Sequence, residues 1–381
     1  MTADSGGPTL PARRRERPSV LTLAAPAKVN LVLEVGERRP DGFHELRSVF
    51  APLALADTLA VRVMAGSDAD AAAGVVAPAA GDLDGARDAG AGPDTLSILG
   101  ASDLPVEGNL VLRAAALLRA DVARALPPLE FRLRKRIPAA AGLGGGSSDA
   151  LAALDLAAAA WGIRLAARRR LVLAERLGSD VPFFCVGGWA LVGGRGERLQ
   201  RLPPPLGGPL GVLLVVPAAR LSTRDVFSAF DAQRAKTCDP GRAPSRAPSR
   251  ARGAGAGSVP RPATALARRL RAAASPAQIA TIEPANDLAP AADALLDGLA
   301  EARAGIGTIL GRPVHLSGSG PSMAVLYPSP GYAREAAAII SAAIARGALH
   351  VPGGSGEVIA TMTGPERPAR RRADAHRGGV A

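Results

Sequence analysis

The chain has 381 residues, enough for two domains, and because 48% of them are hydrophobic but only 3% aromatic, the cores must be aliphatic and rich in alanine. The net charge of +12 is concentrated in arginine-rich segments that no aromatic residues interleave, so we expect solvated tails and no nucleic-acid partner. Two cysteines exclude a disulfide framework or a cysteine metal cluster, and no apolar run reaches the roughly 18 residues of a membrane span, so we expect a cytoplasmic protein without membrane contact.

The chain begins with a basic segment, residues 1–18, which we predict to be a disordered tail. The apolar patch that follows, Val20 to Ala25, is shorter than the roughly 7–15 residues of a signal-peptide core. Thr22 interrupts this patch in the alternating manner of a strand. Further strand-like runs are VNLVLEVG at 29–36 and TLAVRVM at 58–64. The first elements of the fold are therefore predicted to be strands.

The segment 67–94 is acidic, rich in small residues and without apolar periodicity, which indicates an expanded loop. Beyond it the periodicity predicts alternating helices and strands. These are a helix at 109–119, a strand at 129–138, helices at 147–161 and 168–178 and a strand in the apolar run 181–192. Gly178 fits the position just after a helix end.

The second half of the chain is interrupted by a low-complexity insertion, 235–262, which repeats Ala-Pro-Ser-Arg. Around it we expect a strand at 210–216, a helix at 291–304, a strand pair within 314–327, a helix at 332–346 and a strand at 357–362. Residues 366–381 form a second basic tail that we predict to be disordered.

Together these elements predict an α+β fold in two halves. A run of three prolines at 203–205 marks the division between them. We therefore expect one domain over residues 19–203 and a second over residues 206–365.

The stretch PAAAGLGGGSSDAL, residues 138–151, has the composition of a ligand-binding loop. Its glycines at 142, 144, 145 and 146 allow backbone conformations closed to other residues and let a ligand approach the main chain closely. The helix expected from Ser147 points unpaired N–H groups and the positive end of its dipole at the same place. These features form an anion site, for which a phosphate is the natural occupant.

Two standard phosphate motifs do not match this stretch. A Walker loop requires a lysine that is absent, and in a dinucleotide fingerprint counted from Gly142 the third glycine is replaced by Ser147. A glycine-rich turn capped by serine is the alternative interpretation. Four glycines within five residues cost more chain entropy than such a turn requires, so phosphate binding is favoured.

The segment from Pro138 to Asp149 resembles the central ATP-binding motif of the GHMP kinases, a family that includes galactokinase, homoserine kinase and mevalonate kinase. The resemblance implies a two-domain GHMP kinase fold, with a ribosomal-protein-like N-terminal α/β domain and a ferredoxin-like C-terminal α+β domain. It implies ATP and Mg²⁺ as cofactors, and Ser148 is the candidate metal ligand. The implied ATP-binding residues are Asn109, Pro138, Ala139, Ala140, Ala141, Gly142, Leu143, Gly144, Gly145, Gly146, Ser147 and Ser148.

Two other runs narrow the resemblance, APAKVN at 25–30 and RPDGFH at 39–44. They are similar to the family members that phosphorylate the 2-hydroxyl of a cytidine diphosphate-linked methylerythritol in the non-mevalonate isoprenoid pathway. The resemblance therefore implies a small-molecule substrate of this kind, with ADP and the 2-phosphate as products. A monomer or a homodimer is expected.

Lys28 is one of only three lysines in a chain that otherwise uses arginine. Its compact ammonium suits a site that must place a point charge beside a reacting hydroxyl, although an ordinary exposed lysine is the alternative. Asp180 could by position alone cap the turn at Pro182 or act as a general base. The resemblance implies that Asp180 accepts the hydroxyl proton while Lys28 stabilises the alkoxide.

The resemblance also implies a cytosine pocket. Phe43, where the family commonly has Tyr, would stack on the base and His44 would hydrogen-bond its edge. Phe227 is the implied second stacking ring, Thr223 would lie near the substrate phosphates, and Asn30 would orient the substrate. Core packing is the alternative for each Phe.

A second glycine loop, LSGSGP at 316–321, is implied to close over the phosphates, with a plain hairpin turn as the alternative. Other functions remain open at this point. They are another small-alcohol kinase of the homoserine or mevalonate type, an RNA-binding module that shares the N-terminal fold, and a non-catalytic relative of these kinases. The presence of Lys28, Phe43, His44 and Asp180 favours an active kinase with the cytidylated substrate.

Overall fold

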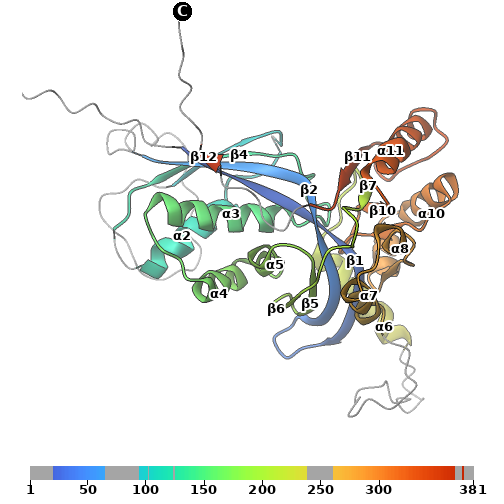
Figure 1. Ribbon diagram of the computed structural model, residues 1–381, viewed down its shortest axis with the longest axis horizontal. Coiled ribbons are helices and arrows are strands. Elements are labelled where there is room, and N and C mark those ends of the chain that lie inside the picture. Colours follow the sequence, from blue (N-terminus) through green and yellow to red (C-terminus); the bar gives the residue numbers. More distant parts are fainter. Residues whose placement is uncertain are drawn as a thin grey trace, which may run out of the picture.

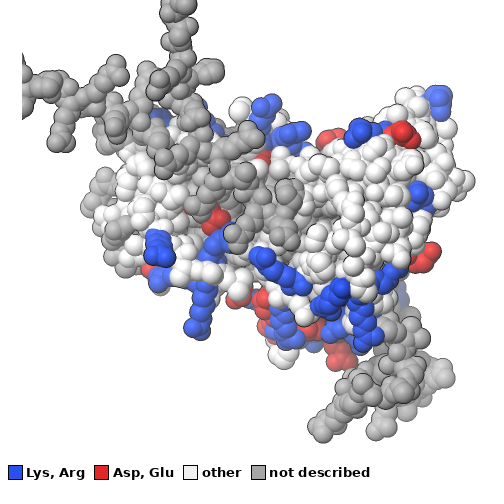
Figure 2. All heavy atoms as spheres, viewed as in Figure 1, with Lys and Arg blue, Asp and Glu red and all other residues white. Residues whose placement is uncertain are grey.

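The structure of the protein, a computed structural model, describes residues 20–64, 94–101, 103–122, 125–237, 261–364 and 371–372. Nearly all of the expected tails, the loop at 67–94 and most of the insertion at 235–262 lie outside these residues. None of the described helices is both long and apolar enough to cross a membrane. The arginine-rich segments likewise lie largely outside the described surface, on which Figure 2 shows cationic side chains gathered along one edge with acidic ones among them.

Within the described residues, eight strands form the larger of two sheets, with the central order β12-β1-β2-β4-β3. They are β1 (Leu21–Arg38), β2 (His44–Val63), β3 (Thr95–Leu99), β4 (Leu129–Arg134), β5 (Ala190–Gly194), β6 (Arg198–Arg201), β8 (Ala285–Asn286) and β12 (Arg371–Arg372). In Figure 1, β1 and β2 run side by side as a long antiparallel ribbon through the centre of the molecule. This ribbon carries the first group of predicted site residues.

Irregularities in β1 lie beside these residues. The pairing with β2 shifts between Pro26 and Lys28 and again between Asn30 and Val32. Proline cannot donate to the ladder, and bulges re-aim the neighbouring side chains, so Lys28 and Asn30 lie between two places where the strand is bent.

Helices cover one face of the larger sheet (Figure 1). They are α2 (Leu110–Val122), α3 (Gly145–Ala160), α4 (Ala167–Leu177) and α5 (Val181–Val186). Leucine and alanine predominate among the buried residues of α3, in agreement with the composition. The glycine-rich loop at 138–144 directly precedes this buried helix, which therefore fixes where the loop ends.

The four-stranded second sheet is antiparallel, with the order β11-β7-β10-β9. Its strands are β7 (Gly211–Pro217), β9 (His315–Leu316), β10 (Met323–Tyr327) and β11 (Gly356–Met362). The helices of this half are α6 (Thr223–Thr237), α7 (Pro262–Arg271), α8 (Pro276–Ile279), α9 (Ala289–Leu295), α10 (Leu299–Leu310) and α11 (Pro330–Ala345). The predicted α+β class is confirmed.

Several expected elements differ from those observed. The run 181–192 begins as helix α5, because Pro182 lies in the first turn, where proline favours helix formation, and short apolar runs do not distinguish helix from strand. The single helix expected at 291–304 is divided into α9 and α10, with Gly298 at a φ of 80° before α10. Gly178 directly follows the end of α4, as expected, with an extended φ of 163°.

The two halves share one hydrophobic core. Val29 and Ala51 of the larger sheet are in the same buried cluster as Val212 and Leu214 of β7. Two short strands from the second half also pair with β1, and one of them is β12 at Arg371–Arg372. The prediction of a disordered tail at 366–381 is therefore wrong for these two residues. Their strand pairs with an edge of β1 that would otherwise be open.

Candidate active site

A cleft of about 500 Å³ lies where β1, the start of α3 and the second glycine loop meet. Most of the predicted site residues line it: Lys28, Asn30, Asn109, the loop from Pro138 to Ser147, Asp180, Thr223 and Phe227. Phe43, His44 and Ser148 are not among the lining residues. The tertiary structure thus brings together residues that are up to about 200 positions apart in the sequence.

The glycine-rich loop has the backbone of an anion nest. Positive φ values recur at every second residue: 54° at Ala140, 72° at Gly142 and 69° at Gly144. Such alternation makes successive N–H groups converge, and the amides of residues 139–147 donate to no other described protein group. A positive φ at alanine costs roughly 1–2 kcal/mol, so the loop keeps a strained backbone around the cleft.

Glycine is required at two of these positions because other groups approach closely. A Cβ at Gly142 would lie 2.3 Å from the carbonyl oxygen of Ser317, and one at Gly144 would lie 2.9 Å from Cγ of Lys28. The hydroxyl of Ser317 also donates to the carbonyl of Gly142 at 3.1 Å. The two glycine loops are therefore packed backbone against backbone.

Asn286, which the sequence analysis did not single out, holds the second glycine loop. Its Nδ2 donates to the carbonyls of Leu316 at 2.9 Å and Gly318 at 2.8 Å. Ser319 of the same loop contacts Thr223, with 2.9 Å between the hydroxyl oxygens. A lone Asn in a two-residue strand gives no sequence signal, and its role emerges only when β8 pairs with β1.

Lys28 and Asp180 face each other across the cleft. Nζ of Lys28 is 3.3 Å from Oδ2 of Asp180 and donates to Oδ1 of Asn30 at 2.6 Å. Lys28 is buried, whereas the Asp180 side chain is 34% exposed and accessible to a ligand. Asp180 lies at the N-cap position of α5 but makes no capping hydrogen bond, so the structure does not use it as a cap.

Asn30 is held between Lys28 and the neighbouring strand. Its Nδ2 donates to Oγ of Ser48 at 3.1 Å, and Ser48 in turn donates to the carbonyl of Val32. The amide group is thereby oriented with its oxygen toward the ammonium. Asn109 lines the cleft from the start of α2, where its Oδ1 accepts from the N–H of Val111 at 3.0 Å.

The expected arrangement of Phe43 and His44 is not observed. Phe43 is 47% exposed and lies beneath the guanidinium of Arg195, whereas His44 is buried and stacks on Phe227 with 5.3 Å between ring centroids. Phe43 lies just before β2, which begins at His44, and of these two rings only that of His44 contacts Phe227. The two ring nitrogens of His44 already face the carbonyl of Gly36 at 3.2 Å and Asp231 at 3.1 Å.

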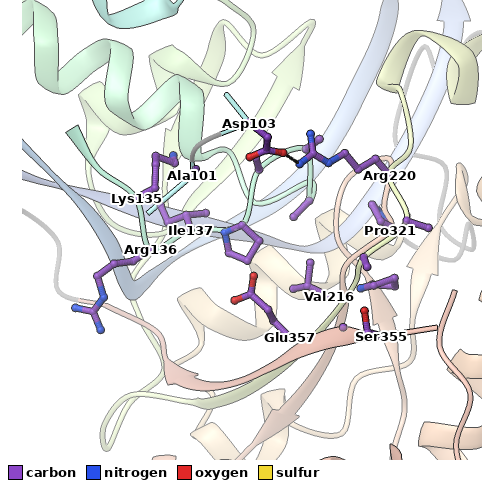
Figure 3. A pocket seen from close by; sticks show the side chains of 18 of the residues that line it. Ala101, Asp103, Lys135, Arg136, Ile137, Val216, Arg220, Pro321, Ser355 and Glu357 are labelled. Atoms are coloured by element: carbon purple, nitrogen blue, oxygen red, sulfur yellow. Dashed lines mark hydrogen bonds and ion pairs between the residues drawn. The ribbon is translucent and has the colours of Figure 1, made fainter. Parts of the chain in front are cut away.

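A second cavity, of about 520 Å³, lies on the other side of the arm that leads into the glycine loop, residues 135–141. Figure 3 shows its two walls, with an ion pair between Asp103 of the first half and Arg220 of the second across the top. Glu357 projects into it from β11. The arm therefore separates two hollows of similar size.

The side chains at the site do not form a cage for Mg²⁺. No group of three or more His, Cys, Asp or Glu among the described residues could hold a metal ion. Ser148, the candidate ligand, is 2% exposed and does not line the cleft, whereas Ser147 does. The donors present fit an ion held mainly by nucleotide phosphates and water, and Ser148 is not placed to bind it.

Comparison with known proteins decides the family. The N-terminal domain of the GHMP kinases is matched over residues 109–188. The 4-diphosphocytidyl-2-C-methyl-D-erythritol kinase of Streptomyces coelicolor is 34% identical over 84% of this chain and 92% of its own length. That of Anaeromyxobacter sp. is 37% identical over 87% of this chain and 88% of its own. The chain belongs to the 4-diphosphocytidyl-2-C-methyl-D-erythritol kinase family.

Solved structures agree with this membership in the kinase family. The crystal structure of 4-(cytidine 5'-diphospho)-2C-methyl-D-erythritol kinase covers 90% of this chain and 99% of its own, with a TM-score of 0.60 and 30% identity. Homoserine kinase from Cytophaga hutchinsonii has a TM-score of 0.62 at 16% identity over 95% of this chain and 100% of its own, which shows a common fold. The 4-diphosphocytidyl-2-C-methyl-D-erythritol kinase family thus accounts for both halves of the chain.

Proposed function

We propose that this protein transfers the γ-phosphoryl group of ATP to the 2-hydroxyl of 4-diphosphocytidyl-2-C-methyl-D-erythritol, giving the 2-phosphate and ADP. The observation that carries the proposal is the Lys28–Asp180 pair, 3.3 Å apart, in the same cleft as the glycine-rich loop. Phosphoryl transfer needs positioned charges and a proton acceptor, and both are present.

The chemistry assigns a separate task to each partner of the pair. Asp180, which is accessible from the cleft, accepts the hydroxyl proton as the substrate oxygen attacks the γ-phosphorus and the bond to the β-phosphate oxygen breaks. Lys28 is buried and held by Asn30, so its ammonium stays fixed beside the developing alkoxide. The proton ends on Asp180, and no covalent enzyme intermediate is needed.

The glycine-rich loop supplies the phosphate site. The free amides of residues 139–147 and the N-terminus of the 16-residue helix α3 point to the same region. Their partial positive charges offset the negative charge of the triphosphate without a lysine of the Walker type. Mg²⁺ would accompany the nucleotide and neutralise phosphate charge, held mainly by phosphate oxygens and water.

The substrate half of the cleft contains Phe227 and Thr223 beside the apolar Leu33 and Leu46. We place the cytosine against Phe227, whose ring is backed by His44, and the diphosphate near Thr223 and Ser319. This differs from a sandwich between Phe43 and Phe227, because Phe43 is exposed and does not line the cleft.

A coupled assay of ADP release tests the proposal with wild type and Asp180→Asn. Loss of the proton acceptor should lower kcat by about 100-fold or more, while ATP binding measured by calorimetry persists. Asp297→Asn, which changes an exposed carboxylate in the second half, is the matched control and should retain wild-type turnover. Turnover by Asp180→Asn within about threefold of wild type would contradict the assignment of the base.

The same assay separates the substrate alternatives. Homoserine and mevalonate are included with the cytidylated alcohol, and turnover of either in its place would contradict the proposed substrate.

We also expect the enzyme to act in the cytoplasm as a monomer or homodimer. Size-exclusion chromatography with light scattering measures the oligomeric state.

A further inference from the structure

Three buried charges lie directly beneath the glycine-rich loop. Nζ of Lys135 is 2.5 Å from Oδ2 of Asp57 and 2.9 Å from Oδ2 of Asp149. The three side chains are only 6%, 0% and 4% exposed. Nζ also lies 3.3 Å from the place that a Cβ on Gly145, the first residue of α3, would take. The charged cluster formed by Lys135, Asp57 and Asp149 thus touches the base of the loop.

Asp57 binds the arm as well as the ammonium. Its Oδ1 accepts hydrogen bonds from the amides of Arg136 at 2.5 Å and Ile137 at 2.9 Å. On the other side of the arm, the amide of Lys135 donates to the carbonyl of Leu99 at 2.8 Å. Figure 3 shows that Lys135 and Arg136, which are consecutive residues of the arm, point to different sides of it. The start of the glycine loop is therefore fixed to β2 through one carboxylate.

The other carboxylate ties the opposite end of the loop. Asp149 lies in the second turn of α3 and lines the nucleotide cleft. Because Lys135 bonds to both carboxylates, the residue before the loop and the helix after it are held at a fixed separation. The distance between these two ends determines how the amides of residues 139–147 converge.

We propose that the buried cluster of Lys135, Asp57 and Asp149 positions the glycine-rich loop for nucleotide binding. The inference rests on the proposed function, because it takes the loop to be the phosphate site. The three residues are positioning residues that act through the loop backbone. A buried ionic cluster is weak support for stability, since hydrophobic replacements are often as stable, so a geometric role explains its presence better.

The cluster also has an unbalanced charge. One ammonium faces two carboxylates, and Oδ1 of Asp149 is buried with no partner among the described residues. Burial, reinforced by Asp57 and opposed by Lys135, raises the pKa of Asp149 to about 7. Burial alone would lower the pKa of Lys135, but the two carboxylates raise it, so the ammonium stays charged. Asp149 is then neutral below about pH 7 and ionised above it.

Other elements packed against α3 leave this balance unchanged. Lys28 of β1 is engaged by Asp180 and Asn30, and α5 has no charged side chain. Arg170 of α4 pairs with Asp155 of α3, and β2 contributes Asp57 of the cluster itself. In α2 the nearby charges are the exposed Arg113 and two residues in ion pairs of their own. These pairs are Arg119 with Asp94 and Asp121 with Arg169. Ionisation of Asp149 therefore adds a negative charge behind the phosphate site, and nucleotide affinity should fall as the pH rises through about 7.

Calorimetric titration with MgATP, without the alcohol, measures this coupling for wild type and Asp149→Asn between about pH 6 and pH 8.5. Near pH 6 the neutral carboxyl resembles an amide, so the two Kd values should converge. Above about pH 7.5 the wild-type Kd should exceed that of Asp149→Asn by roughly threefold to tenfold. ATP itself titrates, but the ratio of the two proteins cancels its contribution. Equal Kd values for the two proteins at every pH overturn the proposal, because Asp149 would then have no influence on the loop.

Asp57→Asn tests the positioning role directly. Its amide nitrogen would face the ammonium of Lys135, so the Kd for MgATP should rise about tenfold or more while the Kd for the cytidylated alcohol changes by less than about twofold. Equal losses for both ligands, or unchanged ATP affinity in a folded variant, contradict the proposal. If this variant does not fold, the pH profile of Asp149→Asn decides alone. A wild type that binds no ATP would contradict the proposed function instead.

Discussion

Adjacent residues at the start of β2 have different surroundings. His44 is buried against Phe227 and its ring nitrogens face protein acceptors, whereas Phe43 points away and is covered only by Arg195. Phe43 precedes the strand, and its ring and that of His44 lie in separate environments. Both residues have rings that could bind cytosine, so the sequence made them equal candidates for the pocket. In the structure only His44 lies against Phe227, which lines the cleft.

Substituting Phe227 and Phe43 one at a time tests this separation. Phe227→Ala should raise the KM for the cytidylated alcohol by about tenfold or more, because one stacking surface worth roughly 1–3 kcal/mol is lost. Phe43→Ala should change the same KM by less than about threefold. Steady-state kinetics at saturating ATP give both values. A larger effect at Phe43 than at Phe227 would restore the sandwich expected from the sequence.

The two glycine loops work as one element. Gly142 packs against the Ser317 carbonyl, Ser317 donates back to Gly142, and Asn286 holds the second loop from behind. Because these contacts involve backbone atoms, side-chain substitutions elsewhere in the loops cannot replace them. The loop pair therefore depends on the absence of a side chain at Gly142.

Gly142→Ala should lower the free energy of unfolding by about 2 kcal/mol or more, since the new Cβ meets a carbonyl oxygen and φ is positive. Gly146→Ala is the matched control, because its Cβ would meet only Leu110 at 3.8 Å and alanine favours helix. Urea denaturation measures both variants. Equal stabilities would show that the loops can separate without cost.

A single strand, β1, contributes to three of the four hydrophobic clusters of the described residues. Leu23 and Ala25 of β1 belong to the core beneath α2 and α3, Ala27 and Val29 to the core shared by the two sheets, and Leu33 to the core of the second half. Lys28, the proposed catalytic lysine, lies within this strand. Displacing one sheet would therefore disturb the other sheet and the active site together.

Leu214→Ala tests this coupling from the second half. Leu214 is fully buried in the shared core, and its truncation should cost about 2–5 kcal/mol. Trp161 reports on the first core and Trp189 on the shared one, so single-tryptophan variants follow each by fluorescence in urea. Both midpoints should shift together. An unchanged Trp161 transition would show that the halves unfold independently.

Periodicity predicted most helices and strands of the fold, because amphipathic patterns depend on local spacing. It did not distinguish helix from strand in the run beginning at Val181. That run begins as a helix because Pro182 lies in its first turn. The paired loops at 138–147 and 316–321 were also identifiable, since glycine-rich anion sites have a compositional signature. The charged cluster was missed because Lys135 reads as a basic residue on a half-exposed strand.

The fold class and the glycine-rich loop could be predicted from residue types and short-range spacing, which do not depend on how the chain folds. The roles of Lys28 and Asp180 were implied by the resemblance of short motifs to the kinase family. Three features are visible only once the chain is folded: Lys28 lies against Asp180, Phe43 is exposed away from the cleft, and Asp57 and Asp149 lie on either side of Lys135. Such contacts join distant segments through strand pairing and burial, and no local pattern encodes which side chains will meet there.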